Sequence, residues 1–203
     1  CEVLDTQKVV AGKFAHKIKV VEGGISVGQM AHFKVNKANR LAVMRNHSCA
    51  HLLQSALRQV LGEHVHQAGQ LVDAKRLRFD FSHFNPMTED EKRQVQRIVN
   101  DYIFAALDIT MKEMPIEEAK KLGAMALFGE KYGETVRVVT MGDEDCTASI
   151  EFCGGTHLDN TAKIGLFNII SESSVASGVR RIEAVTGTGV MDILREYIGI
   201  ARD

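Results

Sequence analysis

Residues 46–62 read NHSCAHLLQSALRQVLG, and this stretch predicts a helix that carries both a core stripe and a candidate site. Asn46 is a suitable N-cap residue, and Gly62 is a suitable stop signal. The apolar residues between them recur at helical spacing, and they are Leu52, Leu53, Ala56, Leu57 and Val60. We therefore expect an amphipathic helix that begins at Asn46 and ends at Gly62.

Two histidines near the start of this helix suggest a metal site. His47 and His51 are four residues apart, which places both imidazoles on one face of a helix, one turn apart. They point away from the apolar stripe, so we do not expect them in the core of this helix. Ser48 stands where the H-E-x-x-H motif of zinc proteases has its glutamate. A solvated histidine pair stays open as the alternative.

A second motif, CGGTH at residues 153–157, supplies the missing ligand types. Paired glycines after a strand favour a tight turn in which Cys153 and His157 converge. Thiolate and imidazole donors without a carboxylate favour zinc over magnesium or calcium. The two motifs together predict a zinc site formed by His47, His51, Cys153 and His157. Cys153 as a small core residue is the alternative.

The rest of the chain predicts an α+β fold. Thr88 and Glu91 form a capping box for a helix that runs to about Leu107, and Pro115 opens a short helix that ends at Lys121. Because helices and strands do not alternate strictly, we expect a mixed sheet with packed helices and not a doubly wound sheet. Strands are expected over residues 77–81, 135–141, 147–152, 164–172 and 179–186.

The first part of the chain, to about residue 44, predicts a small β unit. Its β-branched runs are interrupted by Gly12, the Gly23-Gly24 pair and Gly28, which suggests strands joined by tight turns. The chain begins at Cys1, and its first residues have the pattern of the middle of a strand. We therefore expect a piece of a longer polypeptide.

Composition is that of an ordinary soluble globular protein, with 45% hydrophobic and 25% charged residues and a net charge of −1. No apolar run has membrane-spanning length, so we expect no membrane partner. Four cysteines in a chain of 203 residues do not make a disulfide framework, which favours a reducing cytoplasm. A nucleic-acid partner would need a local basic patch, for which Arg78, Arg180 and Arg181 are candidates. A solvated surface is the alternative reading of these charges.

Four stretches together resemble the editing domain of bacterial alanyl-tRNA synthetase. The resemblance spans about residues 20–190 and keeps the motifs in order. It implies the α+β fold of the threonyl- and alanyl-tRNA synthetase editing domains over residues 41–203, preceded by a partial small β-barrel over residues 1–40. The stretches are NHSCAHLLQSALRQVLG (46–62), LVDAKRLRFDFSHF (71–84), GAMALFGEKYGETVRVV (123–139) and EFCGGTHLDNTAKIGLFNIISESSVASGVRRIEAVTG (151–187).

The resemblance also implies a function. It implies hydrolysis, at the zinc site, of the ester that joins serine or glycine to the alanine tRNA. The implied partners are the acceptor end of that tRNA and the remaining domains of the synthetase. Gln67 matches a glutamine that the family places beside the editing pocket, and we expect it to act in catalysis. Aminoacylation is not expected of this segment.

Some residues depart from the family pattern and leave alternatives open. Ala50 stands where the family has threonine, and Thr156 stands where threonyl-tRNA synthetases have proline before the second histidine. Freestanding alanyl-tRNA editing proteins share both metal motifs, but the long segment LFGEKYGETVRVV (127–139) favours the synthetase. A zinc-stapled tRNA-binding module without hydrolytic activity is a further alternative, because four protein ligands close a zinc shell.

Overall fold

A computed structural model of the chain describes residues 1–126 and 132–200, and it divides into two compact units, Cys1–Val35 and Asn36–Asp203. In the first unit β1 (Glu2–Lys8) pairs antiparallel with β2 (Phe14–Lys19), with the short 3-10 helix η1 (Val10–Gly12) between them. The expected partial barrel is not found among the described residues of this unit, which contain only these two strands. The glycines at 23 and 28 adopt positive φ angles, and this breaks the extended backbone that a third strand needs.

The central helix α1 (Lys37–Leu61) begins earlier than the sequence predicts. Its N-cap is Asn36, whose side chain accepts a hydrogen bond from the backbone N–H of Asn39. The expected N-cap, Asn46, is buried inside the helix, and its side chain bonds to Asp73 and Thr186 instead. The assignment of Asn46 as the N-cap was therefore wrong. An asparagine side chain can cap a helix, but it can also form hydrogen bonds between different parts of the chain, as Asn46 does here. The helix ends at Gly62 as expected.

The larger sheet of the second unit has the strand order β3-β4-β9-β8, and all its neighbours are antiparallel. The expected alternation in β4 is confirmed, since Leu77, Phe79 and Phe81 are fully buried. Helix α2 packs against α1 and β8, and both hydrogen bonds of its predicted capping box are present. The bounds are β3 Gln67–Val72, β4 Leu77–Ser82, β8 Phe167–Ala176, β9 Val179–Thr186 and α2 Glu89–Phe104.

A second, three-stranded sheet has the order β5-β6-β7 and is also antiparallel. The prediction of one mixed sheet was therefore wrong. Neighbouring strands such as β6 and β7 are joined by short turns, which permit only antiparallel pairing. Of the stretch 127–139, residues 127–131 lie outside the described residues, and 135–139 lie in β6. The bounds are β5 Ile109–Pro115, β6 Thr135–Gly142, β7 Thr147–Phe152 and α3 Ile116–Lys121, the last packed on β5 and β6.

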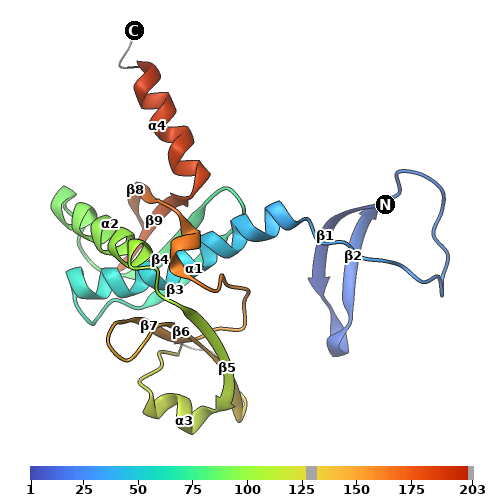
Figure 1. Cartoon of the computed structure of the whole chain (residues 1–203), viewed down its shortest axis with the longest axis horizontal. Coiled ribbons are helices and arrows are strands. Elements are labelled where there is room, and N and C mark those ends of the chain that lie inside the picture. The colour runs from blue at the N-terminus through green and yellow to red at the C-terminus, as the bar shows by residue number, and fades with distance from the viewer. Residues whose placement is uncertain (127–131, 201–203) are drawn as a thin grey trace. The chain divides into compact units, whose positions relative to one another are not determined.

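Helix α1 connects the two sheets (Figure 1), because it contacts β3, β4 and β9 of the larger sheet and β7 of the smaller one. Its predicted stripe is confirmed, since Leu52, Leu53, Ala56 and Leu57 have no exposed surface and the half-buried Val60 packs against the same core. Cys49 is equally buried, as expected of a core cysteine. The face that carries His47 and His51 is turned toward the loop after β7.

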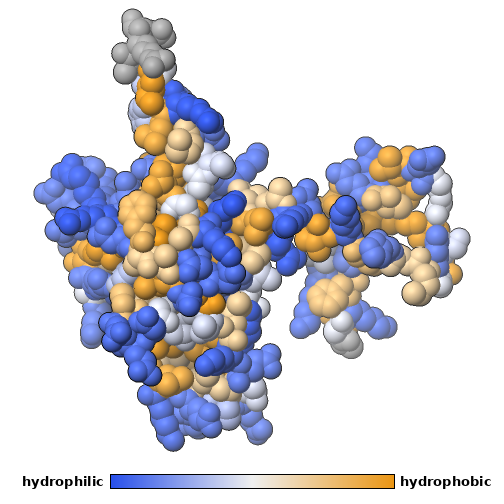
Figure 2. All heavy atoms as spheres, in the orientation of Figure 1, coloured by the Kyte–Doolittle hydropathy of each residue, from blue (hydrophilic) through white to orange (hydrophobic). Residues whose placement is uncertain are grey.

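The second unit ends with the 3-10 helix η2 (Thr161–Ile164), β8, β9 and helix α4 (Thr188–Ile200). Helix α4 contacts β9 at its start, and apolar side chains remain exposed along it (Figure 2), including Met191, Leu194 and Tyr197. Among the helices of residues 1–126 and 132–200, none combines the length and the hydropathy needed to cross a bilayer.

Candidate metal centre

The structure brings together the four residues that the two sequence motifs single out. His47 and His51 come from α1, and Cys153 and His157 come from the turn that follows β7. Their potential ligand atoms all lie within 4.8 Å of one another. His51 and His157 are buried, and the other two are half-buried. The cluster therefore has the composition and the compactness that a bound metal ion requires.

Each of the three imidazoles has a hydrogen-bond partner at Nδ1. Metal-binding histidines in proteins are oriented in this way by a second group that holds the far ring nitrogen. The partners are Thr156 O for His47 (3.2 Å), Glu151 Oε2 for His51 (2.6 Å) and Ser48 Oγ for His157 (3.3 Å).

The opposite ring nitrogens, Nε2, are directed at the cluster. The Nε2 atoms of His47 and His157 lie 3.5 and 3.2 Å from the Sγ atom of Cys153. The Nε2 atom of His51 is buried and has no hydrogen-bond partner among the described residues. A buried ring nitrogen without a partner is costly unless something binds it. Three imidazole nitrogens around one thiol are a donor set that fits a metal ion of the zinc type.

The protonation of the cluster favours the ligand form of its cysteine. Burial alone would raise the pKa of Cys153, but hydrogen bonds with His157 and His47 and the nearby imidazole of His51 bring this pKa far below its usual range. A thiolate is the form that binds metal. Burial opposes the charged form of His51, but Glu151 beside it raises the pKa of this histidine. The pKa of His157 is lowered, first by burial.

The turn that carries Cys153 and His157 approaches α1 very closely. A Cβ atom at Gly155 would lie 2.1 Å from the Cε1 atom of His47, whereas a Cβ atom at Gly154 would meet nothing within 4 Å. The sequence predicts Gly155 for the tight turn. The structure adds a second reason for this glycine, because a side chain at this position would collide with His47 of the helix.

Two residues that contact the cluster, Ser48 and Glu151, were not predicted as site residues from the sequence. Ser48 is fully buried, and its hydroxyl accepts a hydrogen bond from the backbone N–H of Leu158 in addition to its contact with His157. The buried carboxylate of Glu151 accepts from Ser149 Oγ as well as from His51. Glu151 lies two positions before Cys153 on an extended segment, so both face the same side. This spacing is the one signal that could have identified Glu151.

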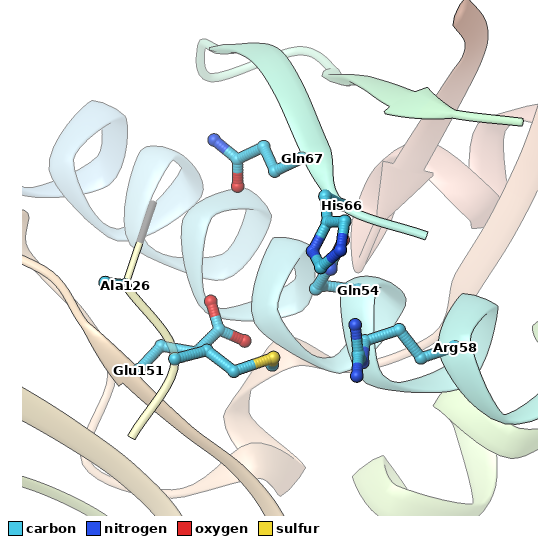
Figure 3. A pocket seen from close by; sticks show the side chains of 7 residues that line it. Gln54, Arg58, His66, Gln67, Ala126 and Glu151 are labelled. Carbon is cyan, nitrogen blue, oxygen red and sulfur yellow. The ribbon is translucent and has the colours of Figure 1, made fainter. Parts of the chain in front are cut away.

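A cavity of about 170 Å³ has Glu151 in its wall (Figure 3), and the same carboxylate bonds His51 of the cluster. Gln67, predicted from the sequence as a site residue, lies in the wall of this cavity at the start of β3. Its carboxamide is therefore placed where it can meet a ligand. The lining residues are Gln54, Arg58, His66, Gln67, Met125, Ala126 and Glu151.

The arginines considered as tRNA contacts lie elsewhere on the larger sheet. Arg180 is buried and forms an ion pair with Glu172, and Arg181 bonds both carboxylate oxygens of Asp80 at 2.7 Å. Arg78 is half-buried. Two of the three charges are thus compensated within the sheet, and the assignment of these arginines to tRNA stays a prediction.

Comparison with known proteins places this geometry in a family context. The family described as the threonyl and alanyl tRNA synthetase second additional domain matches residues 136–183, which include Cys153 and His157. Alanine–tRNA ligase of Bacillus mycoides is 47% identical over 201 residues, 99% of this chain and 22% of the ligase. Alanine–tRNA ligase of Caldicellulosiruptor saccharolyticus is 49% identical over 202 residues, 100% of this chain and 22% of the ligase.

The chain thus spans about a fifth of the length of the curated relatives it matches. The match covers nearly the whole chain, including both metal motifs and the cavity residues between them. Over almost its whole length, the chain therefore corresponds to a segment of bacterial alanine–tRNA ligase, the segment that carries the second additional domain shared with threonyl-tRNA synthetase.

Proposed function

We propose that residues 41–203 form a zinc-dependent editing domain that hydrolyses the ester of seryl- or glycyl-tRNA for alanine. The observation that carries this proposal is the cluster of three imidazoles and one thiol beside a small polar cavity. The homology to alanine–tRNA ligase supplies the substrate class. The proposed partners are the acceptor end of the tRNA and the remaining domains of the synthetase.

Such an activity is needed because a binding pocket discriminates only weakly between small amino acids. A pocket for alanine cannot strongly exclude glycine, which is smaller, or serine, which adds one hydroxyl group. Discrimination on one small group is limited to roughly 10- to 200-fold, so a second, hydrolytic site is needed. An aminoacyl ester is already activated, and the site need only bind it, orient it and deliver water.

The chain's own residues would divide this work. His47, His51, Cys153 and His157 would hold the zinc ion, which when bound supplies Lewis acidity at the ester. Glu151 and Ser48 would keep the imidazoles of His51 and His157 in the ligand orientation.

Gln67 would take part in the reaction from the cavity wall. Its carboxamide offers both a donor and an acceptor to the substrate or to the attacking water. Aminoacylation is not proposed for this segment.

One observation favours a second candidate function. Four protein ligands are typical of structural zinc sites, whereas catalytic sites keep one position for water or substrate. The cluster offers four, so a zinc-stapled tRNA-binding module without hydrolytic activity is the alternative. A freestanding editing protein is less well supported, because the chain matches a segment of a much longer ligase from end to end.

The test uses preformed seryl-, glycyl-, alanyl- and threonyl-tRNA with the full synthetase that contains this segment. We expect loss of zinc and of seryl- and glycyl-tRNA clearance in Cys153→Ala. Cys146→Ala, which removes an exposed cysteine outside the cluster, is the matched control and should keep both.

Two results would contradict the proposal. If Cys153→Ala loses zinc but clears seryl-tRNA normally, the zinc site is a structural staple. If the wild-type enzyme prefers mischarged threonine tRNA, the substrate assignment is wrong.

A further inference from the structure

The cavity beside the metal cluster has the size of a single small ligand. Its volume is about 170 Å³, whereas pockets for drug-sized ligands span roughly 300–1,000 Å³. For comparison, an engineered protein cavity of about 150 Å³ accommodates benzene. The cavity therefore has room for a free amino acid such as glycine or serine.

The cavity carries one group of each charge. Glu151 and Arg58 enter it from opposite sides (Figure 3). The carboxylate of Glu151 is buried on β7, and each of its oxygens has accepted only one hydrogen bond, from His51 or from Ser149. Each oxygen can therefore accept a further bond from a ligand.

Arg58, in the last turn of α1, differs from the arginines of the larger sheet. Its Nη1 atom donates to the carbonyl oxygens of Glu63 (2.7 Å) and Val65 (3.0 Å), and these bonds fix the guanidinium in place. Within residues 1–126 and 132–200 it has no carboxylate partner, in contrast to Arg180 and Arg181. Its Nε and Nη2 atoms have no hydrogen-bond partner in the same part of the chain, so they remain available to an anion.

We propose that this cavity binds a free α-amino acid as a zwitterion, with the ligand's carboxylate at Arg58 and its ammonium group at Glu151. A fixed guanidinium is the group best suited to a carboxylate, and a buried carboxylate is the natural partner of an ammonium ion. The ligand's carboxylate would meet the guanidinium that lacks a carboxylate partner, and its ammonium group would be a second cationic partner for Glu151, which is already paired with His51.

The proposal has a consequence that rests on the proposed function. An aminoacyl ester has the ammonium group but no carboxylate, so it would bind through the Glu151 end alone. Hydrolysis creates the carboxylate and thus adds the contact with Arg58. The released serine or glycine should therefore remain bound and compete with the next ester, which makes the editing site subject to product inhibition.

The test measures binding and needs no turnover. L-Serine, L-serinamide (no carboxylate) and glycerate (no ammonium) are titrated into the zinc-loaded protein, and binding is followed by chemical shifts of the Gln54 and Gln67 side-chain amides. We expect serine to bind at least about tenfold more tightly than either analogue, because a hydrogen bond to a charged group contributes roughly 1.5–3 kcal/mol and 1.4 kcal/mol is tenfold.

Variants separate the role of Arg58 in binding from a role in folding. Arg58→Gln should remove the preference for serine over serinamide, and Arg58→Lys should keep part of it. Arg97→Gln, which removes an exposed arginine from α2, is the matched control and should change neither affinity. Serine and serinamide of equal affinity in the wild type, or an unchanged preference in Arg58→Gln, would overturn the proposal.

The outcome is independent of the proposed function. If seryl-tRNA is cleared but free serine neither binds nor inhibits, the zwitterion site is wrong and the editing function stands. If serine binds as described but no aminoacyl-tRNA is hydrolysed, the binding site stands and the editing function fails.

Discussion

At the scale of single residues, the candidate metal centre depends on side chains that are not themselves ligands. Each imidazole has its Nδ1 atom held by another group, and its Nε2 atom is thereby aimed at the same small volume. Orientation of this kind reduces the rearrangement needed when an ion binds. The close contact between Gly155 and His47 belongs to the same set of constraints.

This contact leads to a prediction with an internal control. In Gly155→Ala the added methyl group would meet the ring of His47 at 2.1 Å, so either the ring or the turn must move out of the cluster. We expect the affinity for zinc to fall by at least about tenfold, the lower range seen when the support of a metal ligand is lost. Competition with a chromophoric chelator measures it.

Gly154→Ala is the control, because its added methyl group meets nothing within 4 Å. Zinc affinity should be nearly unchanged in this variant. Equal losses in the two variants would show that the turn needs glycine for its backbone and that the contact with His47 is unimportant.

The four predicted cluster residues could be found from the sequence because each pair has local spacing. His47 with His51, and Cys153 with His157, are each four positions apart, and two such pairs of metal-binding residue types are informative together. Ser48, Glu151 and Arg58 could not be found in the same way. The partners of Ser48 and Glu151 lie far away in sequence, and the packing of β7 and the following turn against α1 brings them together. Arg58 bonds to backbone carbonyls of the loop after α1, which no pattern of side chains reveals.

At the scale of elements, sequence patterns succeed where a strand or helix has strong local signals. The alternation of β4 and the capping box of α2 are both confirmed. The strands β3 and β5 were missed, because neither has a buried face of regularly alternating apolar residues. Helix α4 was missed as well, and it buries only Val190. The two strands are formed by pairing with β4 and β6, which the sequence alone does not show.

The capping box of α2 should make a measurable contribution to stability. Thr88→Ala removes the acceptor of the Glu91 backbone N–H and one donor to the Glu91 carboxylate. We expect a loss of about 1 kcal/mol in the free energy of unfolding at pH 7, measured by urea denaturation with a chelator present. Asp90→Asn, which changes a charge in the same turn without touching the cap, is the control and should cost less.

The free energy of unfolding lost in Thr88→Ala should become smaller at acidic pH. Hydrogen bonds from Thr88 hold the pKa of Glu91 below its usual range. A lowered carboxyl pKa contributes stability above the unfolded-state value of about 4.3, and this contribution is lost as pH falls through the folded-state pKa. The difference between wild type and Thr88→Ala should therefore shrink below about pH 4. A difference that grows on acidification would contradict this account.

At the scale of the whole molecule, the two compact units differ in how much they bury. Every residue of the first unit whose side chain is described is exposed, whereas the core clusters lie entirely within the second unit. A two-stranded hairpin is at best marginally stable in water by itself. The buried core that stabilises the chain thus lies in the second unit.

Hydrogen exchange should report this difference directly. We expect backbone amides of β1 and β2 to exchange rapidly, and amides of α1, β4 and β9 to exchange slowly, because slow exchange requires opening of a buried core. Mass spectrometry of peptic fragments would resolve the two units. Similar protection in both would mean that the hairpin has a stabilising partner.

The sequence separation between the two halves of the metal cluster also determines when the cluster can form during synthesis on the ribosome. His47 and Cys153 are 106 positions apart. At about 5–20 residues per second, synthesis of the intervening chain takes about 5–20 s. During this interval the nascent helix presents two imidazoles, and the thiol that completes the cluster does not yet exist. The centre can therefore assemble only after the turn with Cys153 and His157 has been synthesised, well after the helix that carries His47 and His51.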